Sequence, residues 1–178
     1  MVYRIHRSID ISFAHHVRGH RGACVNIHGH TWKFEVGLEA DTLDPEGFVV
    51  DFAVLKQRVL EPCHRLLDHS LAVGADTFRD IAEPLAPVGE RLIASRLAVH
   101  DGPIPHETPA IRVGAAEVHY PGGMKVAVFP FSPTSERLAE WLFHFAEREL
   151  ADDRVRVAFA RVYETLHPVE SVAEFTRT

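Results

Sequence analysis

The sequence has few cysteines, no long apolar run and no block of basic residues. Cys24 and Cys63 are the only cysteines among 178 residues, too few for a disulfide framework. The N-terminal stretch MVYRIHRSIDIS interleaves charged and apolar side chains, so it lacks the apolar core of a signal peptide, and no segment approaches the length of a membrane span. We therefore expect a cytoplasmic protein with reduced thiols and no membrane partner.

Positive charge is also scarce. Lys and Arg number 19 against 25 Asp and Glu, which gives a formal net charge of -6, and the basic residues form no cluster. Because nucleic-acid binding usually needs a basic surface, we expect no nucleic-acid partner. Histidine, by contrast, is abundant, with 13 residues against 11 glycines. Since histidine is the commonest metal ligand and the usual acid or base near neutral pH, the positions of these residues become the main question.

Apolar and polar residues alternate near both ends of the chain. Residues 2–15 and 31–38 each place apolar side chains at every second position, which predicts two strands joined as a long hairpin. Residues 154–165 and 170–177 predict two further strands. Between these pairs, apolar residues at spacings of three and four over 52–67 predict a helix.

Proline sets expectations for both helices of this skeleton. Pro62 lies inside the first helical pattern and predicts a kink or a break there. A second helix is predicted after Ser132 as N-cap, with Pro133 as its first helical residue and an end near Ala151. Its buried stripe is expected to be Leu138, Trp141, Leu142 and Phe145.

The order strand, strand, helix, helix, strand, strand predicts an α+β fold, with a four-stranded antiparallel sheet and two helices on one face. The length suits a single domain over 1–178. Residues 72–131 do not fit this skeleton, and we interpret them as an insertion between the helices. It is expected to contain a short helix around 90–99 and a hairpin in which EVHY and MKVAVF flank residues 121–123.

Three histidines are candidate metal ligands. His28 and His30 open the second strand, where residues two apart point to the same side about 6.6 Å from each other, so both can reach one ion. In the first strand His15, and not His16, shares the parity of the apolar residues, so His15 should face His28 and His30 across the hairpin. Three imidazoles with a fourth position left open are typical of catalytic zinc. The alternative is a hydrogen-bonded trio of core histidines.

Cys24 lies four residues before His28. It could complete the metal's ligand shell, or it could remain off the metal as a thiolate whose pKa is lowered by the cation. Asp68 and His69 follow the first predicted helix, where a histidine can simply interact with the helix dipole. The spacing alone leaves these alternatives open.

Glu164 lies within a predicted strand, where a single carboxylate is usually solvated or salt-bridged. Its side chain is expected on the face opposite to three apolar residues of that strand, Val157, Phe159 and Tyr163.

These residues belong to stretches that resemble the 6-pyruvoyltetrahydropterin synthase and 6-carboxytetrahydropterin synthase family, which has the tunnelling fold. The matching stretches, in the family's order, are ISFAH (11–15), CVNIHGHTWK (24–33), VVDFAVLK (49–56), LDHSL (67–71), PTSE (133–136) and VYET (162–165). About a third of the chain, centred on the insertion, falls outside the resemblance.

The resemblance implies a role for each candidate residue. The zinc ligands are matched by His15, His28 and His30, the catalytic base by Cys24, its acid/base partners by Asp68 and His69, and the pterin-anchoring carboxylate by Glu164. The substrate implied is 7,8-dihydroneopterin triphosphate, whose phosphates Arg18, Arg21 and Lys33 could meet.

The spacing CxxxHGH looks like that of the bacterial 6-carboxytetrahydropterin synthases of the queuosine pathway. The reaction implied is a zinc-dependent conversion to 6-carboxy-5,6,7,8-tetrahydropterin with loss of triphosphate and acetaldehyde. A pyruvoyl-forming or side-chain-cleaving synthase is the alternative within the family, and a non-catalytic, zinc-containing pterin-binding module is the alternative outside it. Family members assemble as trimers stacked into hexamers, so a homo-oligomer is expected.

Overall fold

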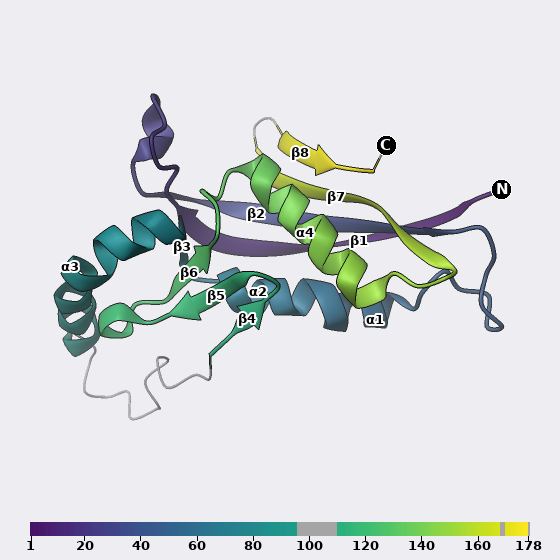
Figure 1. Ribbon diagram of the computed structural model, residues 1–178, viewed down its shortest axis with the longest axis horizontal. Coiled ribbons are helices and arrows are strands. Elements are labelled where there is room, and N and C mark those ends of the chain that lie inside the picture. Colours follow the sequence, from purple (N-terminus) through teal and green to yellow (C-terminus); the bar gives the residue numbers. More distant parts are fainter. Residues whose placement is uncertain (96–109, 168–169, 178) are drawn as a thin grey trace.

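A long antiparallel sheet forms the centre of the protein (Figure 1). The computed structural model describes residues 1–95, 110–167 and 170–177. The central strands are β1 (Tyr3–His15), β2 (His28–Ala40), β7 (Val155–Thr165) and β8 (Ser171–Phe175). They lie side by side in this order, and each neighbouring pair is antiparallel. The predicted four-stranded skeleton is therefore confirmed.

One face of this sheet is apolar, as the alternation predicts. On β1 and β2 the buried side chains are Ile11, Phe13, Trp32, Phe34, Val36 and Leu38. The same parity continues to the ends of both strands, where His15 pairs with His28. We call this apolar side the inner face and the opposite side the outer face.

The first helical segment on the inner face is interrupted. It consists of α1 (Phe52–Leu55), a π-helical turn (Lys56–Leu60) and α2 (Glu61–Leu67). The N–H of Glu61 bonds to the carbonyl of Lys56, five residues earlier. Pro62, in the first turn of α2, has no N–H and cannot continue the regular i to i−4 ladder, so the irregularity predicted at this position is confirmed.

The second helix on this face is α4 (Ser135–Leu150), and it crosses the sheet beside β7 and β8 (Figure 1). Its predicted stripe is confirmed, because Leu138, Trp141, Leu142 and Phe145 are all buried. The predicted N-cap is wrong by two residues. Thr134 has the extended backbone of a cap and its hydroxyl accepts from the Arg137 N–H, whereas the hydroxyl of Ser132 accepts from the Arg18 N–H.

The insertion enlarges the sheet. Its elements are β3 (Leu71–Gly74), α3 (Ala75–Ala94), β4 (Arg112–Val113), β5 (Ala116–His119) and β6 (Val126–Phe129). The strand order is β4-β5-β6-β3-β1-β2-β7-β8, so the sheet has eight strands where four were predicted. β3 runs parallel to the last two residues of β1 and to β6, which makes the sheet mixed.

α3 packs on the outer face, opposite to α2 and α4. Leu71, Val73, Val126 and Val128 form a second apolar cluster against Phe78, Ile81 and Leu85 of this helix. Ala72 and Ala127, which point the other way, join the main core. The predicted helix around 90–99 is wrong at its start, since α3 begins at Ala75, and residues 96–99 lie outside the described part of the chain.

The predicted hairpin of the insertion is confirmed. β5 and β6 are antiparallel and are joined through a 3-10 turn at Pro121–Gly123. Gly122 has φ +55, and a side chain there would meet the backbone of Ala86 on α3 at 1.9 Å. Only glycine allows so close an approach, so the backbones of α3 and of the β5–β6 hairpin are in direct contact. Among the described residues no helix has the length and apolar character that a bilayer span requires.

Candidate metal centre and active site

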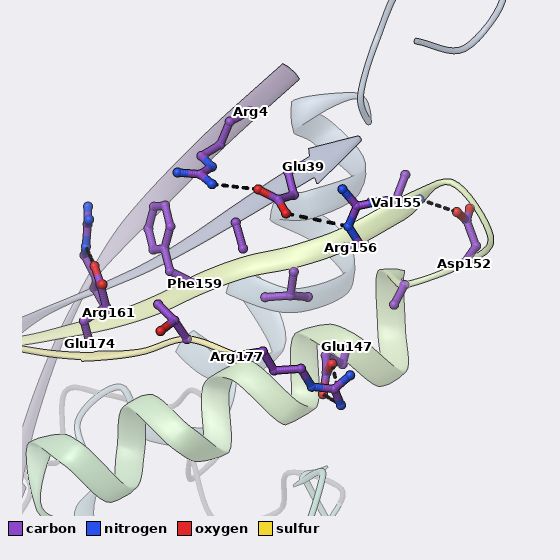
Figure 2. A pocket seen from close by; sticks show the side chains of 14 residues that line it. Arg4, Glu39, Glu147, Asp152, Val155, Arg156, Phe159, Arg161, Glu174 and Arg177 are labelled. Atoms are coloured by element: carbon purple, nitrogen blue, oxygen red, sulfur yellow. Dashed lines mark hydrogen bonds and ion pairs between the residues drawn. The ribbon is translucent and has the colours of Figure 1, made fainter. Parts of the chain in front are cut away.

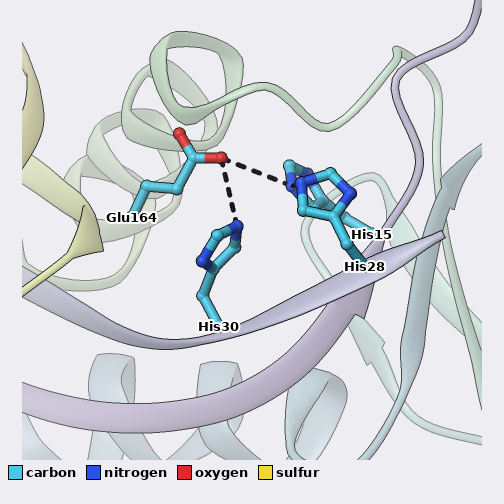
Figure 3. A group of neighbouring side chains, drawn as sticks. All are labelled: His15, His28, His30 and Glu164. Carbon is cyan, nitrogen blue, oxygen red and sulfur yellow. Dashed lines mark hydrogen bonds and ion pairs between the residues drawn. The ribbon is translucent and has the colours of Figure 1, made fainter. Parts of the chain in front are cut away.

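The three predicted histidine ligands converge at one end of the inner face. His15 lies on β1, and His28 and His30 open β2 (Figure 3). The Nε2 atoms of His15 and His28 are 3.0 Å apart. A carboxylate oxygen of Glu164, on β7, lies 3.4 Å from Nε2 of His15 and 3.6 Å from Nε2 of His30. One atom from each of these four residues lies within 4.8 Å of the others, and we call the set the His/Glu cluster.

Backbone carbonyls orient two of the three imidazoles. Nδ1 of His15 lies 2.9 Å from the carbonyl of Pro133, and Nδ1 of His28 lies 2.9 Å from the carbonyl of Asn26. A carbonyl only accepts, so each Nδ1 must carry the proton and donate it. Each Nε2 then keeps its lone pair and points toward the cluster. Such outer hydrogen bonds are the usual means of orienting metal-ligating histidines.

A bulge in β7 brings Glu164 to this face. Gly37 of β2 pairs with Phe159, but the next residue, Leu38, pairs with Val157, so Ala158 is an extra residue on β7. A second irregularity, opposite β8, falls at Glu164 itself. The first bulge reverses the alternation of β7, so Val157 and Phe159 occupy opposite faces. The expectation that Glu164 lies opposite to Val157 is therefore wrong, although it does lie opposite to Phe159.

The electrostatics of the cluster favour a bound cation. Burial, together with the charges of His15 and His28, lowers the pKa of His30 despite the opposing effect of Glu164, so this imidazole is neutral at pH 7. The neighbouring imidazole of His15 and the hydrogen bond from the Ser135 hydroxyl, which outweigh burial, hold the pKa of Glu164 at about 2. An ionised carboxylate thus faces imidazole lone pairs.

The donor set fits a small tetrahedral metal ion. Bonds of about 2.0–2.1 Å in tetrahedral geometry place ligand atoms about 3.3 Å apart, close to the observed 3.0, 3.4 and 3.6 Å. Nε2 of His30 is buried and has no hydrogen-bond partner among the described residues. The facing Nε2 atoms of His15 and His28 repel each other unless a proton or a cation lies between them. A cation would satisfy all three nitrogens at once. The rings of His15 and His30 also rest edge-on against Trp32, which makes the floor of the cluster rigid.

Cys24 does not belong to the His/Glu cluster. It lies in a short 3-10 turn, Ala23–Val25, within the loop that joins β1 to β2, and it is a partly exposed free thiol. Among the described residues, its sulfur is not one of the atoms grouped within 4.8 Å. Of the two alternatives that the spacing leaves open, the geometry favours a cysteine that remains off the metal.

Asp68 and His69 form a hydrogen-bonded pair directly after α2. Nδ1 of His69 donates to the Asp68 carboxylate at 2.8 Å, which leaves Nε2 free to take or give a proton. Although burial opposes ionisation of Asp68, the hydrogen bond from His69 and the charges of His64 and His69 lower its pKa. The imidazole of His69 is largely exposed, with 84% of its side-chain surface accessible, so a substrate or a second chain can reach it.

The structure does not bring Lys33 to the cluster. Lys33 alternates with His30 and Trp32 on β2 and lies on the outer face, where its ammonium sits 3.8 Å from the ring centre of Tyr163 and 3.6 Å from the Glu170 carboxylate. Within one chain, Lys33 and the three histidines therefore cannot contact the same bound molecule. Its role in binding the triphosphate stays a prediction.

A hollow of about 640 Å³ lies well away from the histidines, beside the first half of β7 (Figure 2). Its charged groups are mostly paired with one another. Arg4 binds Glu39 at 2.7 Å, Arg161 binds Glu174 at 2.5 Å, and Arg177 lies 3.0 Å from Glu147. Since these charges are already neutralised in pairs, the hollow offers no converging donor set comparable with the His/Glu cluster.

Four supporting residues have no role in the site according to the sequence-based expectations. Pro133 and Asn26 supply carbonyls to the ligands, Ser135 donates to Glu164 at 2.7 Å, and Lys125 binds the turn that carries Asp68. Backbone carbonyls leave no mark in a sequence, and Lys125 belongs to the insertion, so no motif signals either contribution.

Solved structures share this fold. A protein from Wolinella succinogenes superimposes with a TM-score of 0.69 at 22% identity, over 100% of this chain and 99% of that one. The 6-pyruvoyl tetrahydropterin synthase from Plasmodium vivax superimposes with a TM-score of 0.54 at 14% identity, over 99% of both chains. Fold and site together define an α+β protein of the tunnelling fold with a three-histidine, one-carboxylate cluster that could hold a metal ion.

The family follows from the sequence comparisons. The family model described as 6-pyruvoyl tetrahydropterin synthase matches residues 4–176, so the chain belongs to this family. A Bacillus subtilis protein named 6-carboxy-5,6,7,8-tetrahydropterin synthase is 39% identical over 77 residues, an alignment that spans 43% of this chain and half of that protein. A Haemophilus influenzae protein of the same name is 23% identical over 92% of this chain and 94% of its own length.

Proposed function

We propose that this protein is a zinc-dependent enzyme that converts 7,8-dihydroneopterin triphosphate to 6-carboxy-5,6,7,8-tetrahydropterin, releasing triphosphate and acetaldehyde, in the queuosine pathway. The observation that carries the proposal is the convergence of three imidazole Nε2 atoms, two of them fixed by backbone carbonyls, in a chain whose curated relatives bear that product's name. The two free cysteines fit a reducing compartment, so the proposal places the reaction in the cytoplasm.

His15, His28 and His30 would hold the zinc ion. When bound, zinc supplies Lewis acidity that makes the hydroxyl groups of the substrate's side chain more acidic. Cys24, off the metal, is assigned the role of base, and His69 moves the second proton while Asp68 orients its imidazole and stabilises its charged form. Glu164 would accept the two adjacent N–H donors of the pterin ring through its two oxygens, which fixes the ring's orientation.

The decisive experiment supplies zinc-loaded protein with 7,8-dihydroneopterin triphosphate and identifies the products by mass spectrometry. Carboxytetrahydropterin together with acetaldehyde supports the proposal. Pyruvoyltetrahydropterin would instead support the second candidate, a pyruvoyl-forming synthase, which the name of the family model and of the Plasmodium structures favours. A hydroxymethylpterin would indicate side-chain cleavage.

A Cys24→Ala variant separates catalysis from a non-catalytic binding role. Because Cys24 lies outside the His/Glu cluster, the variant should retain one zinc ion per chain and lose turnover. Loss of zinc and of folding in this variant would indicate a structural Cys/His site. If the wild-type protein turns over no neopterin at all, the enzyme proposal is abandoned in favour of a pterin-binding module.

We also propose that the chain assembles as a trimer stacked into a hexamer. Within the described residues only Ala14 and His15 of β1 pair with β3, so most of that edge of β1 is open, and β8 forms the opposite edge of the sheet. Open edges readily pair with another strand. Light scattering after size-exclusion chromatography should give three or six times the chain mass of 20.0 kDa, and a monomer would contradict this part of the proposal.

A further inference from the structure

The turn that carries Asp68 and His69 has a strained backbone. His69 has φ +55, and it is the only non-glycine with positive φ among the residues that the structure describes. A histidine pays a steric penalty in this region, and such a conformation persists only where neighbouring groups hold it. The question is which groups hold this turn.

One side of the turn is held by β1. The N–H of His69 donates to the carbonyl of Ser12 at 2.8 Å, and the N–H of Ala14 donates to the carbonyl of Ser70 at 3.0 Å. These bonds attach the turn to the same strand that carries His15. They are main-chain contacts, so they are independent of side-chain identity.

The other side is held by Lys125, which comes from the insertion. Its ammonium donates to the carbonyl of Asp68 at 2.6 Å and to the carbonyl of Arg65 at 2.9 Å, and its own carbonyl accepts from the Leu71 N–H at 3.0 Å. The ammonium thereby satisfies carbonyls at the C-terminus of α2, where the helix dipole favours a positive charge. Burial lowers the pKa of Lys125, while the charge of Asp68 acts in the opposite direction.

We propose that Lys125 is a positioning residue for the Asp68–His69 pair, and that the inserted segment thereby supports the acid/base machinery. The inference rests on the proposed function for the role of His69, but the contact itself does not depend on it. The ammonium binds the carbonyl of the residue directly before His69, so it restrains the backbone angle that aims the imidazole. The close backbone contact between Gly122 and Ala86 of α3 holds the hairpin in place, and with it the segment from which Lys125 extends.

Lys125 also contributes to the electrostatics of the pair. The charged and titratable groups that face the Asp68 carboxylate are His69, His64 on α2, and Lys125 on the segment before β6. Removing the ammonium removes a positive charge from the neighbourhood of His69.

The test compares Lys125→Met with Lys125→Arg, using Lys56→Met as the matched control. Lys56 lies in the π-helical turn before α2, is 45% exposed and pairs with Glu61 at 3.3 Å. For Lys125→Met we expect kcat to fall by about 10- to 100-fold with KM little changed, together with faster hydrogen exchange at the His69 amide. Lys125→Arg should restore much of kcat, and Lys56→Met should resemble the wild type.

The spectroscopic arm keeps this proposal separate from the proposed reaction. Hydrogen exchange at the His69 amide can be measured by NMR whether or not the protein turns over a neopterin. If turnover is absent but Lys125→Met still speeds exchange at this amide, the positioning role stands and the proposed reaction fails. Unchanged exchange at the His69 amide in a folded Lys125→Met protein would overturn the positioning role.

Discussion

At the scale of single residues, the cluster depends on which nitrogen of each imidazole carries the proton. The carbonyls of Pro133 and Asn26 fix Nδ1–H on His15 and His28, and the lone pairs left on Nε2 face each other at 3.0 Å. Ser135 similarly holds one oxygen of Glu164. The site is thus prepared for a cation by groups that never touch it.

Removing one of these ligands should abolish stoichiometric metal binding. In His28→Ala the remaining imidazoles no longer provide three converging nitrogens, so we expect well below one metal ion per chain after dialysis, against one for the wild type. Elemental analysis by mass spectrometry measures this ratio. His144→Ala, which alters a half-exposed histidine paired with Glu147 on α4, is the control and should keep its metal. Full metal occupancy in His28→Ala would contradict the assignment.

A second residue-scale prediction concerns Glu35, a buried carboxylate on the outer face. Burial raises its pKa, but hydrogen bonds from Tyr163 at 3.0 Å, Arg161 at 3.3 Å and His6 at 2.7 Å outweigh burial and lower the pKa below 4.5. The folded-state pKa is thus below the unfolded one, so Glu35 stabilises the fold above about pH 4.5 and this contribution is lost as the pH falls through the folded-state value.

The Glu35→Gln variant should therefore be less stable than the wild type by about 1–3 kcal/mol at pH 7, and the difference should shrink as the pH falls below 4.5. Urea unfolding at a series of pH values measures both free energies. If a bound metal ion is lost at low pH, the loss affects the two proteins equally and cancels in the difference. A difference that stays constant from pH 7 to pH 3 would show that Glu35 does not carry this pH dependence.

At the scale of elements, the bulge in β7 determines which side chains reach the His/Glu cluster. With Ala158 as the extra residue, the inner face receives Val157 before the bulge and Val162 and Glu164 after it. The ring of Phe159 then covers Gly37 on the outer face. Without the bulge, Val157 and Glu164 would point to opposite faces of the sheet, so one of them would leave the inner face.

Gly37→Ala tests this arrangement. The new Cβ would lie 2.2 Å from the ring of Phe159, so the ring or the bulge must move, and we expect a loss of about 1–3 kcal/mol in the free energy of unfolding. Gly29→Ala, in the same strand, meets its nearest atom at 3.4 Å and should change stability far less. Adding Phe159→Ala should remove the steric part of the Gly37→Ala effect in a double-mutant cycle. Equal stability of the two alanine variants would argue against the close approach.

At the scale of the whole molecule, the His/Glu cluster joins distant parts of the chain. His15, His28 and Glu164 come from three neighbouring strands, and the carbonyl that orients His15 precedes α4. A bound ion therefore links both ends of the sequence across the sheet. Ligands that bind only the folded state stabilise it by mass action.

Removal of the metal should accordingly lower the melting temperature of the whole domain. A metal present at 100 times its Kd adds about 2.7 kcal/mol, which for a chain of this size corresponds to roughly 5–10 °C. Calorimetry of metal-loaded protein with and without a chelator measures the shift. His28→Ala should melt at the same temperature in both conditions. A wild-type protein that is indifferent to the chelator would mean that the cluster holds no structural or catalytic ion.

The sequence by itself determined the skeleton of the sheet and the placement of three histidines. Backbone geometry imposes a period of two on every regular strand, so the parity that buries Ile11 and Trp32 also directs His15, His28 and His30 to the inner face. Residues 72–131 have no comparable pattern to say which existing strand they extend, so the mixed eight-stranded sheet could not be foreseen.

The tertiary structure alone decided the rest of the site. The face of Glu164 depends on a bulge, and a bulge arises from packing between strands more than a hundred residues apart. The carbonyl that orients His15 lies 118 residues away, and Lys125 reaches Asp68 across 57 residues. A sequence pattern records local periodicity, whereas these contacts exist only because the folded chain brings distant backbone atoms together.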